Sequence, residues 1–125
     1  MRRRRITAEK LAIAALMAGG LPEYMPVVVA IVKAMCEPQF GLHGSTASTG
    51  GSATFVVVNG PVRTKLGMNA THNVLANASR ANATIGRSIR LFILNVLGGA
   101  PGHLDRSTLG HPGKFTFCIA EDEED

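Results

Sequence analysis

The sequence predicts an α+β fold in which helices pack on one face of a small mixed sheet, in the order α-α-β-β-α-β. Apolar residues recur at helical spacing in three stretches, residues 7–18, 22–36 and 84–97. Short stretches rich in β-branched and aromatic residues follow the second and the third of these, as expected for strands. A chain of 125 residues with 46% apolar residues can bury a core of its own, so we expect a single domain spanning residues 1–125.

The first two helices have clear start and stop signals. Thr7 can cap a helix over 7–18, and the Gly19-Gly20 pair ends it. Pro22 suits the first turn of a helix over 22–36, and Pro38 stops it. The Val-rich run at 27–32 is also compatible with a strand, but the apolar stretch continues too far for one. Two helices joined by so few residues should pack against each other in antiparallel orientation.

The next stretch predicts a β-hairpin. Residues 42–48 form a weak first strand, Gly50-Gly51 the turn, and residues 54–58 a strong second strand. Residues 63–81 are polar and irregular, with one short helical turn. The third helix, 84–97, has Asn82 or Thr84 as its N-cap, and a Gly/Pro-rich loop over 98–113 leads to a last strand at 114–119. Three strands make a thin sheet, so a homo-oligomer or a partner covering its open face is expected.

The charge of the chain is unevenly distributed. Residues 1–6 form a basic tail and residues 121–125 an acidic tail. Between them, residues 6–120 contain nine basic and four acidic residues, a balance of about +5 within a total of +4. A basic body favours anionic partners. Nucleic acid is the less favoured choice among them, because aromatic residues for base stacking make up only 5% of the chain.

The start of the third helix is the best candidate for a binding site. With a cap at 82–84, the backbone N–H groups of residues 85–87 would have no partner within the helix. Gly86 would let an anion approach the backbone, Thr84 would add a hydroxyl, and Arg87 and Arg90 would share one face. These residues predict a cradle for a carboxylate or a phosphate. The alternative is an ion pair with the protein's own acids, such as those of the acidic tail.

Other residues give weaker signals. Asn59, Asn69 and His43 are secondary candidates for the same pocket. The segment HGSTASTGGS, residues 43–52, is rich in glycine and hydroxyl groups and could wrap a phosphate. It lacks the Gly-Lys-Ser/Thr ending of a phosphate loop, however, and is more typical of a flexible hairpin turn. The four histidines and two cysteines show no zinc-ligand spacing, so no metal and no cofactor is expected. No complete catalytic constellation appears, so the sequence assigns no reaction.

The first twenty residues resemble a signal peptide in their basic start. Glu9 and Lys10 interrupt the approach to the apolar run, which is only eight residues long, so the sequence predicts an uncleaved, cytoplasmic protein. No apolar stretch is long enough to span a bilayer, and no membrane partner is expected. Cys36 and Cys118 are too far apart for a CxxC motif and are predicted to be free, buried thiols.

Six stretches of the chain carry a resemblance to a known family: EKLAIAALMAGGLPEYMPVVVA, LHG, VVVNGP, LGMN, RANATIGRSIRLFILNVLGGAPG and GKFTFCIAEDEE. They resemble an uncharacterised bacterial family whose members accompany, or are fused to, a small redox domain with a UGSC or CGSC motif. The resemblance covers residues 8–124 and is most specific over 80–100. It implies a redox-associated cytoplasmic protein whose partner is a UGSC/CGSC-type protein. This chain has neither motif, and it has Gly20 where relatives often have Cys.

These observations support three hypotheses about function. The first is a small domain that binds an anionic molecule and belongs, by resemblance, to a thiol- or selenol-linked oxidoreductase system. The second is a non-catalytic subunit-interaction module. The third is a nucleic-acid binder that uses many of the basic residues, namely those at 2–5 with Arg63, Lys65, Arg80, Arg87 and Arg90.

Overall fold

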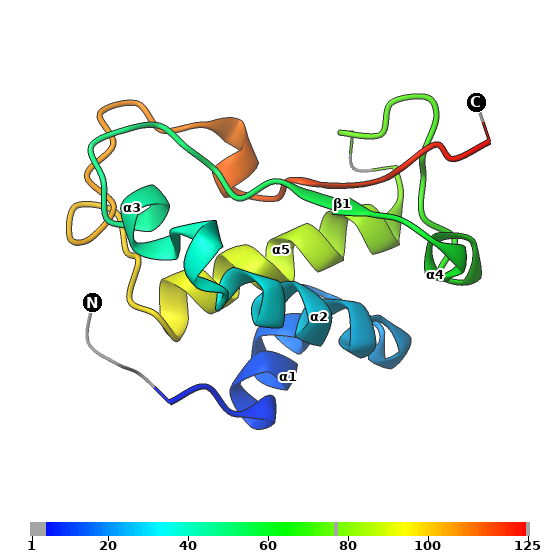
Figure 1. The fold of residues 1–125 in the computed structure, drawn as a ribbon, viewed down its shortest axis with the longest axis horizontal. Helices are drawn as coiled ribbons and strands as arrows, with labels where there is room; N and C mark the ends of the chain where they lie inside the picture. Colours follow the sequence, from blue (N-terminus) through cyan, green and yellow to red (C-terminus); the bar gives the residue numbers. More distant parts are fainter. Residues whose placement is uncertain (1–4, 77, 125) are drawn as a thin grey trace.

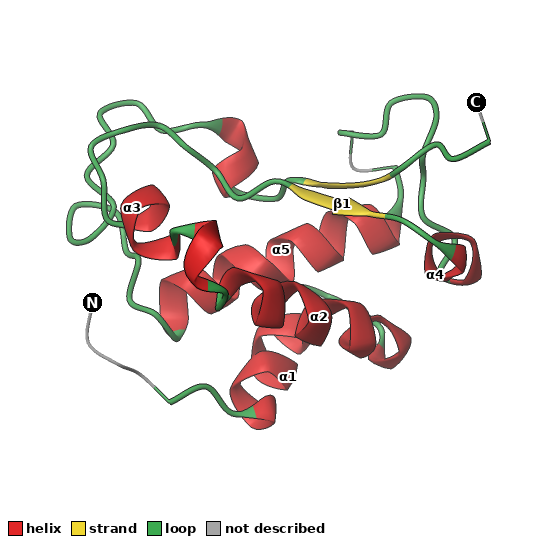
Figure 2. Ribbon diagram, viewed as in Figure 1, coloured by secondary structure: helices red, strands yellow, loops and turns green. Residues whose placement is uncertain are grey.

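The computed structural model describes residues 5–76 and 78–124. The basic residues 2–4 and the acidic Asp125 lie outside the described residues. Helices and strands are mixed, which confirms the α+β class (Figure 2). Five α-helices and two short strands follow one another in the order α-α-α-β-α-α-β along the described chain, so the expected order of elements is only loosely matched (Figure 1).

The first two helices form where the sequence predicts them. Helix α1 spans Ala8–Met17, and the hydroxyl of Thr7 accepts a hydrogen bond from the backbone N–H of Lys10 at 3.3 Å. A 3-10 turn, Pro22–Tyr24, leads into α2, Met25–Met35, so the Val-rich run is helical. Pro38 begins a second 3-10 turn, Pro38–Phe40, as a proline should after a helix.

Helix α5, Arg80–Asn95, is the central element of the fold. Phe92, Ile85 and Ile89 on it are at most 2% exposed. One apolar cluster lies between α5, α1 and α2, and a second lies between α5, α2 and the sheet. Because α5 contributes to both clusters, little of its surface remains for polar contacts, and Arg87 and Arg90 lie on that remaining surface.

The predicted start of this helix, at residue 84, is wrong. Ser79 is the N-cap, and its hydroxyl accepts a hydrogen bond from the backbone N–H of Asn82 at 3.3 Å. Asn82 is 1% exposed, and its side chain donates to the carbonyl of Asn69 at 2.8 Å. Thr84 donates its hydroxyl to the carbonyl of Arg80, one turn back, at 2.8 Å. The side chains of Asn82 and Thr84 are thus hydrogen-bonded within or beside the helix and do not mark its start.

The predicted hairpin is also wrong. Residues Leu42–Thr46 form a short helix, α3, in which the hydroxyls of Ser45 and Thr46 donate to the carbonyl of Leu42. Strand β1, Val56–Val58, pairs in parallel with β2, Cys118–Ala120, in the register Val56↔Cys118. Helix α4, Pro61–Lys65, and α5 lie in the connection between the strands, as parallel pairing requires.

The two-stranded sheet has helices on one face, as predicted. Val56, Val58, Cys118 and Ala120 are buried toward the helices, whereas Val57 on the other face is 48% exposed. The last strand begins at Cys118, later than predicted, because the 3-10 turn Pro112–Lys114 takes up the start of that stretch.

The two cysteines differ in burial. Cys118 in β2 is buried, as predicted, but Cys36 at the end of α2 is exposed, so the prediction that both thiols are buried is wrong for Cys36. Over residues 5–76 and 78–124, no single helix is long and apolar enough to cross a membrane. In the same residues, one pair of consecutive helical segments, Pro22–Met35 and Pro38–Thr46, reaches the length and apolar composition of a membrane span when the two are taken together, but the pair is bent by 77°.

Candidate functional site

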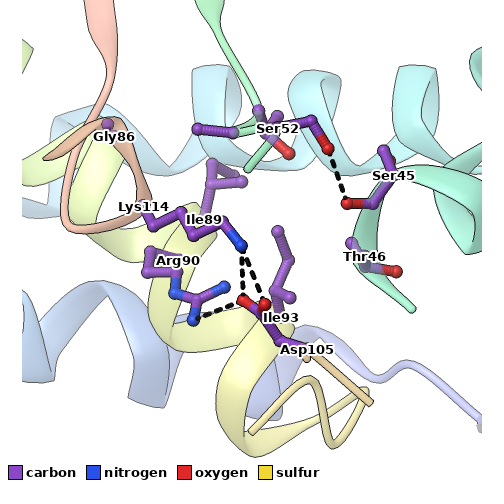
Figure 3. A pocket seen from close by; sticks show the side chains of 12 residues that line it. Ser45, Thr46, Ser52, Gly86, Ile89, Arg90, Ile93, Asp105 and Lys114 are labelled. Atoms are coloured by element: carbon purple, nitrogen blue, oxygen red, sulfur yellow. Dashed lines mark hydrogen bonds and ion pairs between the residues drawn. The ribbon is translucent and has the colours of Figure 1, made fainter. Parts of the chain in front are cut away.

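Arg90 on α5 and Lys114 at the end of the 3-10 turn both point at the carboxylate of Asp105 (Figure 3). The Lys114 ammonium lies 2.8 Å from each oxygen of Asp105, and Arg90 Nη2 lies 3.5 Å from Oδ2. Ser107 donates its hydroxyl to Oδ1 at 2.7 Å and its backbone N–H to the same atom at 3.2 Å. Helix α5, the Gly/Pro-rich loop and the 3-10 turn therefore meet at one carboxylate, and we call Arg90, Asp105, Ser107 and Lys114 the Asp105 cluster.

The Asp105 cluster is largely buried and carries excess positive charge. Asp105 is 7% exposed, and the side chains of Arg90 and Lys114 are each 15% exposed. Burial raises the pKa of Asp105, but hydrogen bonds from Lys114 and Ser107 outweigh it and bring that pKa down to about 2. Asp105 is therefore ionised at neutral pH, and one negative charge faces two positive charges.

A small recess opens beside the Asp105 cluster. The hydroxyl-bearing residues Ser45, Thr46, Ser52 and Thr54 line its other wall (Figure 3). Its volume is about 20 Å³, which is room for one water-sized group. The hydroxyls of Ser45, Thr46 and Ser52 already donate to backbone carbonyls. The Lys114 ammonium already donates to both oxygens of Asp105 and to the Ser107 hydroxyl. Among the described lining residues, the groups that can still offer donors to an incoming anion are Arg90 and Thr54, and Lys114 contributes its charge.

The structure brings only part of the predicted site to this recess. Arg90 and Gly86 line it. Arg87 points elsewhere: its guanidinium stacks 4.0 Å from the centre of the Phe115 ring and donates to the Phe115 carbonyl at 3.4 Å. Thr84 lies beside Gly19 and Gly20 and bonds within its own helix. Since α5 begins at Arg80, residues 85–87 lie inside the helix, and the predicted free N–H groups do not exist.

Gly86 has a packing role in this arrangement. A Cβ atom at this position would lie 2.4 Å from the hydroxyl oxygen of Thr116 and 2.8 Å from the backbone nitrogen of Phe117. The close approach that the sequence suggested for an anion is made instead by the protein's own chain. Gly86 thus lets the segment between Lys114 and β2 lie directly against α5.

The three weaker candidates are dispersed. Asn69 is bonded to Asn82, accepts from the backbone of Thr71 and donates to the carbonyl of His72. Asn59 is exposed at the end of β1. His43 is exposed on α3, the helix that supplies Ser45 and Thr46, but it is not among the residues that line the recess.

Residues 121–124, the described part of the acidic tail, form no ion pair with Arg87 or Arg90, which was the predicted alternative to an external anion. It pairs with Arg63 on α4, whose Nη2 lies 3.3 Å from Glu123 Oε2 and also bonds Glu124 Oε1. The backbone N–H of Gly60 donates to the other oxygen of Glu123. The hydrogen bond to Glu124, together with the charges of both glutamates, raises the pKa of Arg63, and Arg63 lowers the pKa of Glu124. We call Gly60 and Arg63 the Arg63 cradle.

Sequence reasoning missed Asp105, Lys114 and Arg63 as members of carboxylate clusters. One signal was present, because only four acidic residues occur between positions 6 and 120 and Asp105 is the one in the Gly/Pro-rich loop. An isolated acid in such a loop is a natural counter-charge for a buried cation. Nothing in the sequence indicates which cation it meets.

Within residues 5–76 and 78–124, no group of three or more His, Cys, Asp and Glu residues could hold a metal ion. Comparison of the chain with protein-family models, with curated proteins and with solved structures finds no match. The function is therefore inferred from the geometry of the chain itself.

Proposed function

We propose that this protein is a small anion-binding domain and that the recess beside the Asp105 cluster receives the charged end of a carboxylate or phosphate ligand. The observation that carries the proposal is that Arg90 and Lys114 share a single counter-charge, Asp105, in a largely buried position. The remaining positive charge is held where solvent screens it weakly, so it favours an anion from outside.

The size of the recess limits how such a ligand binds. A volume of about 20 Å³ accepts one oxygen-sized group and not a whole small molecule. The ligand would place one oxygen between Arg90 and the Thr54 hydroxyl, near the positive charge of Lys114, and the rest of it would remain outside. Arginine and lysine side chains form stronger hydrogen bonds with ionised oxygens than with neutral ones, which would discriminate against uncharged ligands.

The test is thermal unfolding with phosphate, succinate or chloride at matched ionic strength. At one hundred times its dissociation constant, a ligand stabilises the folded protein by about 2.7 kcal/mol, which is a shift of several degrees in a domain of this size. Lys114→Gln and Arg90→Gln should lose most of that shift. Arg106→Gln should keep it, because Arg106 is exposed and its Nε donates only to the carbonyl of His103. Equal melting temperatures in all three salts would refute anion binding.

The resemblance to a redox-associated family bears on the partner of this domain. Burial raises the pKa of the Cys118 thiol to about 12, so that thiol stays protonated at neutral pH and is a poor nucleophile. Cys36 is exposed and has no second cysteine beside it for a disulfide. Within a thiol- or selenol-linked system of the cytoplasm, we therefore assign this chain ligand binding, with the redox group on a UGSC/CGSC-type partner. The nucleic-acid alternative is weakened, because Arg63 and Arg90 are paired with the protein's own acids.

A second candidate function, a subunit-interaction module, is favoured by one surface. Ile13, Leu16 and Met17 on α1 are 49%, 76% and 62% exposed, and their spacing places them on one stripe of the helix. The partner that fits is a second copy in antiparallel orientation. Lys10 near the start of α1 would then face the carbonyl end of the other α1, whose last turn has no basic residue.

Analytical ultracentrifugation tests this second candidate. The parent should be a dimer, and Met17→Glu should be a monomer, because a buried charge in the stripe has no partner. Leu109→Glu is the control, since Leu109 is 98% exposed outside this stripe. A monomeric parent, or a dimer that survives Met17→Glu, excludes this interface.

A further inference from the structure

The Arg63 cradle lies where ligands commonly bind in parallel α/β sheets. Asn59, Gly60 and α4 directly follow β1, and residues 121–124 directly follow β2, so both segments leave the sheet at its carboxyl edge. Sheets of parallel strands generally hold their ligands just outside this edge. In Figure 1, α4 and the C-terminus lie on the right of the molecule, and the loop that carries Asp105 lies on the left. The two carboxylate clusters are therefore separate.

The donors of the Arg63 cradle are fixed in place. Arg63 is 9% exposed, although it is charged, and it is anchored on a helix that begins right after the turn at Gly60. Its Nη2 donates to both Glu123 and Glu124. Its Nε is buried and has no hydrogen-bond partner among the described residues. The guanidinium therefore has hydrogen-bonding capacity that the present carboxylates do not use.

The acceptors, in contrast, come from the surface. The side chains of Glu123 and Glu124 are 36% and 69% exposed. Ion pairs with exposed partners stabilise a fold only weakly. A buried guanidinium without a counter-charge is costly. Departure of the acidic segment therefore costs the two glutamates little, and the cost falls on Arg63 unless another carboxylate takes their place.

We propose that the Arg63 cradle is a binding site for an external dicarboxylate, and that Glu123 and Glu124 occupy it as built-in competitors. One carboxylate of the ligand would replace Glu123 between the Gly60 N–H and Arg63 Nη2. Its second carboxylate would take the place of Glu124 on the same guanidinium. This site uses none of the residues of the Asp105 cluster, so the proposal does not depend on anion binding there.

The experiment measures succinate binding to the full-length chain by calorimetry, with chloride matching the ionic strength. Glu123→Gln combined with Glu124→Gln removes the competing charges and keeps the shape of the side chains. If the competitors occupy the cradle about nine-tenths of the time, this variant should bind succinate about tenfold more tightly than the parent. Adding Arg63→Lys should abolish most of the gain, because lysine keeps the charge but not the planar guanidinium that fixes the direction of the Nη2 donors.

Two further measurements locate the bound succinate on the molecule. On addition of succinate, the amide resonance of Gly60 should shift in the Gln variant and much less in the parent. This comparison does not use Arg63→Lys, so it holds even if that change lowers the stability of the fold. Arg106→Gln in the same background should leave the succinate affinity unchanged, because Arg106 is exposed and belongs to neither site. The shift at Gly60 distinguishes binding at the cradle from binding at the recess beside Asp105. The proposal fails if the Gln variant binds succinate no better than the parent. It also fails if the gain in affinity survives Arg63→Lys, if it is lost with Arg106→Gln, or if the Gly60 resonance does not move.

Discussion

Asp105 and Glu123 each accept hydrogen bonds from a cation, but the burial of the two partners is reversed between the two sites. In the Asp105 cluster the carboxylate is 7% exposed and is held by two cations and a serine. In the Arg63 cradle the guanidinium is the buried group, and the carboxylates are the exposed side chains of a segment that follows the last strand.

This difference determines what each site can exchange. Asp105 cannot leave its cluster without exposing Arg90 and Lys114 to each other, so it behaves as part of the core. Glu123 and Glu124 are already partly solvated, so the cost of their departure falls on Arg63, and a replacement carboxylate can offset it. A buried anion among cations is thus a structural element, whereas a buried cation among exposed anions is a site at which the anion can be replaced.

The largest effect is expected from Asp105→Asn. This change keeps the shape of the side chain but leaves two cations facing each other without a counter-charge, and removal of one member of a buried ion pair typically costs about 3–5 kcal/mol. The free energy of unfolding in urea measures it. Glu123→Gln is the matched control in the Arg63 cradle and should have a much smaller effect, because its side chain is 36% exposed. Equal losses in the two variants would remove the distinction between the sites.

The second-largest effect is expected from acid, which should lower the free energy of unfolding by protonating Asp105. The folded-state pKa of Asp105, about 2, lies below the ordinary value of an aspartate, near 4. Its stabilising effect is therefore complete above about pH 5 and is lost as the pH falls toward 2, with a magnitude on the order of 2 kcal/mol. Urea unfolding across this range should show the parent and Asp105→Asn converging as the pH falls. A constant difference between them at every pH contradicts the low pKa.

Gly86→Ala should disturb the Asp105 cluster without changing a charge. A new Cβ would meet Thr116 and the backbone of Phe117, so the segment behind Lys114 must move. Overpacking of this kind costs about 1–3 kcal/mol, partly offset by the better helix propensity of alanine, about 1 kcal/mol. Gly44→Ala in α3 is the control, since a Cβ there meets nothing within 4 Å. If Gly86→Ala is as stable as Gly44→Ala, the close approach of β2 to α5 is not required.

The smallest expected effect is that of added salt. It tests most directly whether Glu123 is held less firmly than Asp105. The Gly60 N–H donates to exposed Glu123, whereas the Ser107 N–H donates to buried Asp105. Near 1 M salt the screening length falls to about 3 Å, which weakens exposed ion pairs much more than buried ones. Amide hydrogen exchange should therefore accelerate at Gly60 with added salt and remain slow at Ser107. The same salt response at both amides would show that Glu123 is held as firmly as Asp105.

Much of the secondary structure was predictable because its signals are local. Thr7 caps α1, Gly19 and Gly20 follow its end, and Pro38 prevents α2 from continuing. The three valines of β1 were recognised as a strand from their residue type alone. Each of these signals acts within a few residues of the chain, so no knowledge of the rest of the fold is needed to read it.

The errors occur where distant segments compete with local signals. Residues 42–48 resemble a strand, but β1 takes its partner from residues 118–120, and the Val56 N–H donates to the Phe117 carbonyl at 2.9 Å. Asn82 resembles a helix cap, but its side chain is hydrogen-bonded to the backbone of Asn69, and α5 starts earlier, at Arg80. A cap or a turn is only a preference of about 1 kcal/mol, which a long-range contact easily overrides.

The sequence by itself determined the α+β class, the first two helices and the apolar face of α5. Only the tertiary structure decided which acid each arginine meets: Asp105 for Arg90 and the acidic tail for Arg63. The physical reason is that a charge specifies no partner along the chain. Its partner is whichever opposite charge the packing of the apolar core brings within a few ångströms and shields from water.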